Sequence, residues 1–96
     1  MGLLASPFLV SASDDLHIEI TKKSLGKEVV ITQGAREWFM LIEVTPENSV
    51  VVRQEKEHNA YIVDESETHD RPMTASEVDA AINDYVNSVK TRAAKK

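Results

Sequence analysis

The stretch that most constrains the fold runs from Arg36 to Val44, because it is apolar on both sides of an extended strand. Side chains alternate between the two faces of a strand, so each face carries its own apolar set. One face carries Trp38, Met40, Ile42 and Val44, and the other carries Phe39 and Leu41. A strand of this kind belongs in the interior of a sheet, where other elements cover both sides.

A turn and a second strand follow directly. Residues 45–48 (TPEN) favour a turn, because proline fixes φ at the second position and asparagine tolerates unusual backbone angles. The β-branched residues at 50–52 then favour a paired strand. Runs at 16–21, 29–32 and 60–63 predict further strands, and every connection is too short for a parallel crossover. The sequence therefore predicts a four- or five-stranded, mostly antiparallel meander sheet.

Residues 74–93 predict a C-terminal amphipathic helix. Thr74 and Glu77 have the spacing of a capping box, in which each side chain binds the other residue's backbone N–H. Apolar residues then recur on one helical face, which must be buried against another element. That face consists of Val78, Ala81, Ile82, Tyr85, Val86, Val89 and Ala93. The expected fold class is α+β, with the helix packed on one face of the sheet.

The 96 residues are expected to form a single domain, because two separate cores would not fit in this length. Residues 1–15 are ambiguous between an edge strand and a poorly ordered terminus. Residues 64–72 are acidic and contain no large apolar side chain, so we expect a solvated linker between the last strand and the helix.

One helix can cover only one face of the sheet, which leaves Phe39 and Leu41 on a face that needs a second cover. Residues 1–15, closure of the sheet into a partial barrel, or a second copy of the chain would each provide it. Small domains with an open apolar face often self-associate, so a homodimer is the expected state.

The composition argues against several kinds of chemistry. The chain has no cysteine, which excludes disulfides, thiolate metal ligands and a cysteine nucleophile. Its three glycines are scattered, so they form no glycine-rich phosphate-binding loop. The histidines match no metal-ligand spacing. We therefore expect no enzymatic activity, no cofactor and no metal. The absence of cysteine and of a membrane-spanning apolar run is typical of a cytoplasmic protein.

The leading functional hypothesis is a small non-enzymatic protein that docks on another protein. Inhibitors, immunity proteins and viral, phage-encoded antagonists of host machinery offer an analogy of size and charge, since the net charge is −5. An acidic segment would attract a basic partner, and an open apolar face would bind it. The candidate contact residues are Asp64, Glu65, Glu67, Asp70, Phe39 and Leu41.

Two alternatives remain open. A single-stranded nucleic-acid-binding protein would use a basic sheet edge, with exposed aromatic rings stacking on bases. That edge would consist of Lys22, Lys23, Lys27, Arg53 and Lys56. The balance of 16 acidic against 11 basic residues disfavours it. The other alternative is a structural subunit whose open sheet face is buried within a larger assembly.

Overall fold

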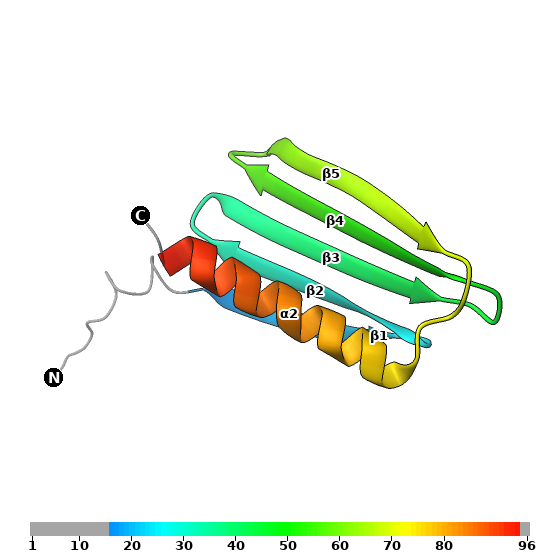
Figure 1. Cartoon of the computed structure of the whole chain (residues 1–96). Coiled ribbons are helices and arrows are strands. Elements are labelled where there is room, and N and C mark those ends of the chain that lie inside the picture. The colour runs from blue at the N-terminus through cyan, green and yellow to red at the C-terminus, as the bar shows by residue number, and fades with distance from the viewer. Residues whose placement is uncertain (1–15, 95–96) are drawn as a thin grey trace, which may run out of the picture.

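The computed structural model describes residues 16–94 and contains a five-stranded antiparallel sheet with one helix packed on it (Figure 1). The strands follow one another in sequence order: β1 (His17–Lys23), β2 (Gly26–Gln33), β3 (Arg36–Val44), β4 (Ser49–Glu57) and β5 (Ala60–His69). The chain then enters the helix α2 (Ala75–Ala94). The predicted α+β fold, a meander followed by one C-terminal helix, is confirmed.

Tight turns explain why the strands follow in order. His58 and Asn59 both have positive φ, at 52° and 68°, as a two-residue hairpin turn requires. Gly34 has a positive φ, at 60°, which glycine adopts without steric cost. In the longer turn between β3 and β4, the Thr45 hydroxyl donates to Asn48 Oδ1 at 2.9 Å and accepts from the Asn48 N–H at 3.0 Å. Such turns return the chain beside the strand that it has just left.

The core lies between α2 and the central strands. Figure 1 shows α2 lying along β1 and β2 with β3 beside it, while β4 and β5 lie beyond its edge. The sheet contributes Val29, Ile31, Trp38, Met40, Ile42 and Val51, and the helix contributes Val78, Ile82, Tyr85, Val86, Val89 and Ala93. The apolar helical stripe and the inward face of β3 therefore agree with the sequence pattern.

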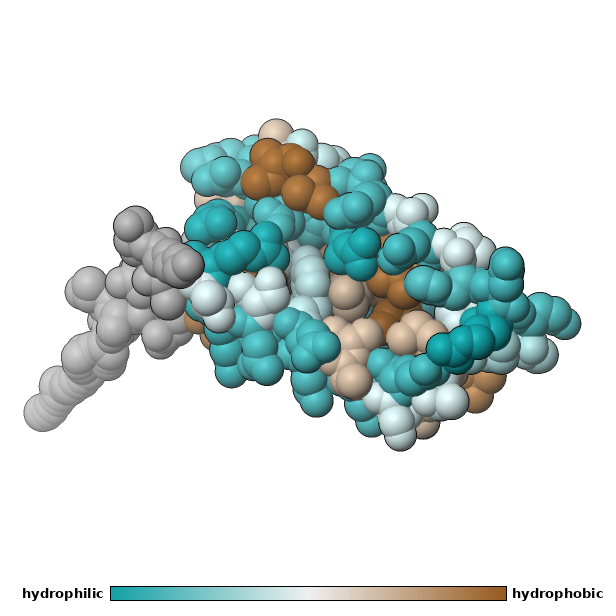
Figure 2. Space-filling view, viewed as in Figure 1, coloured by the Kyte–Doolittle hydropathy of each residue, from teal (hydrophilic) through white to brown (hydrophobic). Residues whose placement is uncertain are grey.

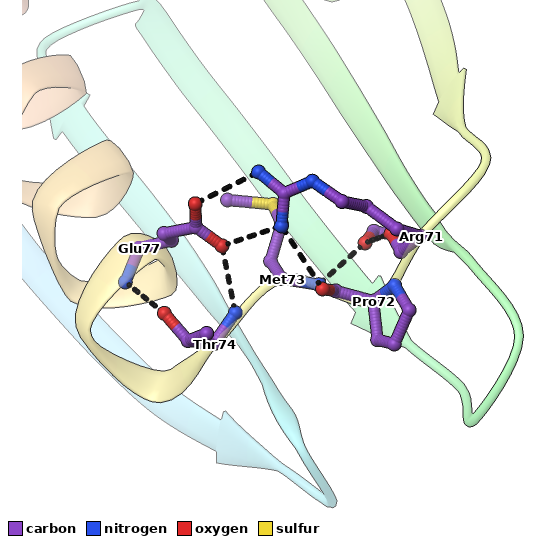
Figure 3. A network of polar contacts seen from close by, with 6 residues as sticks. Arg71, Pro72, Met73, Thr74 and Glu77 are labelled. Atoms are coloured by element: carbon purple, nitrogen blue, oxygen red, sulfur yellow. Dashed lines mark hydrogen bonds and ion pairs between the residues drawn. The ribbon is translucent and has the colours of Figure 1, made fainter.

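The start of α2 is held by a network of polar contacts, drawn in Figure 3. The Thr74 N–H donates to Glu77 Oε1 at 2.9 Å, and the Glu77 N–H donates to Thr74 Oγ1 at 3.1 Å, which is the predicted capping box. Arg71 donates to both oxygens of the Glu77 carboxylate, at 3.0 and 2.9 Å. The Arg71 hydrogen bond, followed by that from the Thr74 backbone, lowers the pKa of Glu77 to about 2.

A buried hydroxyl joins this helix start to the sheet. Ser49, the first residue of β4, is fully buried. Its hydroxyl donates to the Arg71 carbonyl at 2.7 Å and accepts from the Met73 N–H at 2.8 Å. The segment between β5 and α2 is thereby fixed against β4.

The expectation of a linker over residues 64–72 is wrong for most of its length, because β5 continues to His69. This strand pairs with β4 along its whole length, from Ala60 opposite Glu57 to His69 opposite Ser49. An edge strand that is exposed on both sides is held by backbone pairing and needs no apolar side chains. Such a strand has no hydrophobic pattern in the sequence from which it could be predicted. The alternatives for residues 1–15 fall outside the described residues.

Candidate functional site

The face of the sheet turned away from α2 is the candidate site, and we call it the open face. Along β3, the buried Trp38 and Met40 point toward α2, so Phe39 and Leu41 point to the open face. Residues directly opposite each other in an antiparallel pair share a face, so the strand register assigns the remaining side chains. No element within residues 16–94 covers the open face.

A cluster of half-buried apolar side chains occupies the middle of the open face. Val30 lies opposite Phe39 across β2 and β3, and Val52 lies opposite Leu41 across β3 and β4. The apolar cluster consists of Val30, Phe39, Leu41, Val50 and Val52. Side chains of neighbouring strands are close enough to touch, so the cluster forms one continuous patch. Apolar patches with polar surroundings are characteristic of interaction sites.

The apolar cluster is surrounded by carboxylates. The same register places Glu19, Glu28, Glu37, Glu43 and Asp64 on the open face, and we call these residues the acidic rim. Lys23 and Lys56 share the face, but each lies in an ion pair, Lys23 with Glu28 at 3.5 Å and Lys56 with Glu37 at 3.8 Å. The open face therefore carries an excess of negative charge.

The acidic residues that the sequence grouped together do not form one surface. They are Asp64, Glu65, Glu67 and Asp70. Because β5 extends through the first three, Asp64 points to the open face while Glu65 and Glu67 point to the helix side. Arg53 pairs with Glu65 at 3.7 Å and with Glu67 at 3.6 Å. Of the three residues on β5, only Asp64 lies on the same face as Phe39 and Leu41, and Asp70 follows the end of the strand.

The basic residues of the nucleic-acid alternative are also divided. Lys23 and Lys56 lie on the open face, and Lys22, Lys27 and Arg53 lie on the helix side. Lys27 is paired with Asp79 of α2, and Arg53 with the glutamates of β5. Trp38 is only 1% exposed and is not available to stack on a base. The arrangement gives little support to a continuous basic edge.

A hollow opens at one end of the open face, beside the apolar cluster. It has a volume of about 220 Å³. It is lined by Glu37, Phe39, Gln54, Lys56 and Tyr61. Lys56 Nζ lies 5.3 Å from the centre of the ring of Tyr61, a residue that is 56% exposed. Glu37 and Gln54 were not candidate residues in the sequence, because only the register between strands places them beside Phe39 and Lys56.

The helix side of the sheet has fewer features of a binding site than the open face. Figure 2 shows this side as largely hydrophilic, with a hydrophobic patch over the start of β5 and further hydrophobic areas toward the start of α2. A smaller hollow of about 150 Å³, lined by His69, Arg71, Met73 and Glu77, adjoins the start of α2. Arg71 and Glu77 bind each other there, so their charges are already satisfied. Buried between helix and sheet, the hydroxyl of Tyr85 donates to the Phe39 carbonyl at 3.3 Å, and burial raises its pKa to about 12.

Residues 16–94 contain neither a metal site nor a membrane-spanning helix. No three histidine, aspartate or glutamate side chains in that range gather closely enough to hold a metal ion. The helix in that range is too polar to cross a membrane. Comparisons with protein families, curated proteins and solved structures found no match for the chain. Its function must therefore be argued from the surface of the molecule.

Proposed function

We propose that this protein is a small non-enzymatic binding module that docks another protein on its open face. The observation that supports this function is the apolar cluster enclosed by the acidic rim, with no covering element among the described residues. Protein interfaces have the same anatomy, an apolar centre with few charges and a polar border.

The charge of the rim indicates the chemistry of the partner. Complementary potentials speed association and reject wrong partners, so an acidic border fits a partner with a basic border around an apolar centre. The rim also disfavours the homodimer expected from the sequence, because a two-fold face-to-face pair would bring two acidic rims together. An inhibitor, an immunity-type protein or an antagonist of host machinery would act in this way, by covering a basic surface of its target.

The test uses a photo-crosslinking amino acid, benzoylphenylalanine, at one of two positions of the full chain. Position 52 lies in the apolar cluster, and position 87 lies on the exposed outer surface of α2. In cells that produce the protein, we expect position 52 alone to crosslink to a distinct protein with a basic surface. When the crosslinking is repeated in a lysate of these cells, rising salt should reduce the yield, because the rim attracts that surface electrostatically.

Two variants that add the same charge distinguish a loss of docking from a loss of folding. Leu41→Glu places a carboxylate in the apolar cluster and should abolish the crosslink from position 52. Ala80→Glu adds the same charge on the exposed surface of α2 and should leave the crosslink intact. Thermal melting followed by circular dichroism checks that both variants are folded.

Each other occupant of the open face would give a different result and overturn the proposal. Crosslinks solely between copies of the chain would mean a homodimer. Crosslinks within one chain to residues 1–15 would mean that the chain covers its own face. Crosslinks to nucleic acid would favour the alternative binder, and equal yields from positions 52 and 87 would mean that contact is non-specific.

A further inference from the structure

We infer that the hollow beside the apolar cluster is an anchor site for an arginine side chain of the partner protein. This inference rests on the proposed function and specifies one contact within it. The hollow, of about 220 Å³, is smaller than the roughly 300–1,000 Å³ of typical small-molecule sites. It suits a single side chain, and interfaces commonly bind one large anchor residue in such a pocket.

The strand register explains why the hollow lies here. Glu37, Lys56 and Tyr61 form one row across β3, β4 and β5, and Phe39 and Gln54 belong to the next row. Between these rows β5 contains a bulge, since Tyr61 lies opposite Lys56 but Val63 lies opposite Glu55. A β-bulge bends and twists its strand and re-aims the side chains beside it. The rows are therefore not packed tightly against each other at this point.

The groups at the hollow suit a planar cation. The rings of Phe39 and Tyr61 line it, and a guanidinium is attracted to the face of an aromatic ring. The Glu37 carboxylate also lines it, and Asp64 lies beside it, accepting a hydrogen bond from Gln54 Nε2 at 3.0 Å. Guanidinium groups bind carboxylates with two parallel hydrogen bonds and stack on aromatic rings, which a lysine ammonium cannot do.

Lys56 already occupies the position that the partner's cation would take. Its Nζ lies 5.3 Å from the centre of the Tyr61 ring and 3.8 Å from Glu37 Oε1. The ion pair is long and partly exposed to solvent, and ion pairs of this kind contribute little to stability. The lysine side chain is flexible and its ammonium is strongly hydrated, so it can move into solvent. An arriving arginine would displace the Lys56 ammonium and make closer contacts with Tyr61 and Glu37.

The experiment titrates N-acetylarginine methylamide into the ¹⁵N-labelled full chain and follows the backbone amide shifts by NMR. We expect weak but saturable binding, with shifts confined to the strands around the hollow. The corresponding citrulline derivative has the same shape without the charge. It should bind at least about tenfold more weakly, because its neutral urea group cannot form an ion pair with Glu37.

Three variants make the assignment specific. Lys56→Met keeps most of the side-chain length but removes the competing ammonium, so it should tighten binding of the arginine derivative several-fold. Glu37→Gln should abolish saturable binding. Glu19→Gln makes the same charge change on the acidic rim away from the hollow, and should leave binding unchanged. Circular dichroism melts confirm that each variant is folded.

Clear outcomes would overturn the anchor site. Equal affinity for the arginine and citrulline derivatives would show that charge is not recognised. Equal weakening by Glu19→Gln and Glu37→Gln would show general attraction to an acidic surface, and weaker binding to Lys56→Met would show that Lys56 is not a competitor. If any of these occurs while position 52 still crosslinks to a partner, the anchor site fails and the docking function stands. Specific arginine binding without such a crosslink would retain the site and refute the docking function.

Discussion

Replacing Ser49 by alanine should destabilise the fold, because the hydroxyl connects two parts of the chain that are distant in sequence. It donates to the carbonyl of Arg71 at 2.7 Å and accepts from the N–H of Met73 at 2.8 Å. Ser49 itself is 0% exposed, so water cannot replace the hydroxyl without a local rearrangement. The alanine methyl group fits the space but leaves both backbone groups without this partner.

The expected cost follows from the two hydrogen bonds. Each contributes about 1 kcal/mol to stability, so the variant should lose about 2 kcal/mol. In a domain of this size, that corresponds to a fall of about 10 °C in melting temperature. Urea unfolding gives the free energy, and hydrogen exchange measured by NMR reports on the Met73 amide, which should exchange faster in the variant.

Ser66→Ala is the matched control, since Ser66 is exposed on β5. Its unfolding free energy should stay within about 0.5 kcal/mol of the parent. If Ser49→Ala were as stable as Ser66→Ala and the Met73 amide kept its protection, Ser49 would not anchor the start of α2, and the reasoning would be refuted.

Two further predictions concern the helix start and the pairing of β2 with β3. The pKa of Glu77 is lowered from 4.5 to about 2 by Arg71, so its contribution to stability is present above pH 4.5 and lost as the pH falls through 2. The melting temperature of the parent should therefore exceed that of Glu77→Gln at pH 7, and the two should converge between pH 4.5 and 2; a constant difference would contradict this. A Cβ on Gly26 would overlap the backbone oxygen of Ile42, so Gly26→Ala should lower the free energy of unfolding by about 1–3 kcal/mol in urea unfolding. An unchanged unfolding midpoint would show that the two strands can separate there without loss.

The candidate site was only partly predictable from the sequence. Phe39 and Leu41 were assigned to a common face, because alternation along one strand is a local property. Their neighbours Val30, Val50 and Val52 could be found only from the register that places them opposite β3. The hollow around Tyr61 depends in addition on a bulge, which one extra residue creates and which no hydrophobic pattern reveals.

The sequence determined the secondary-structure elements and their order, because these depend on interactions between residues close together in the chain. The pattern from Trp38 to Val44 specified a central strand, the spacing of Thr74 and Glu77 specified the helix start, and the short turns specified an antiparallel meander. These signals depend on residues a few positions apart, so they act in any fold.

Only the tertiary structure decided which residues of different strands share a surface. The helix could bury one face of β3, and it covers the face of Trp38 and Met40, which leaves Phe39 half-buried on the other face. The length of β5 came from backbone pairing with β4, which divided the acidic residues of 64–70 between the two sides of the sheet. Packing and pairing between segments distant in sequence determine such choices, because each depends on the energy of the whole sheet with its helix.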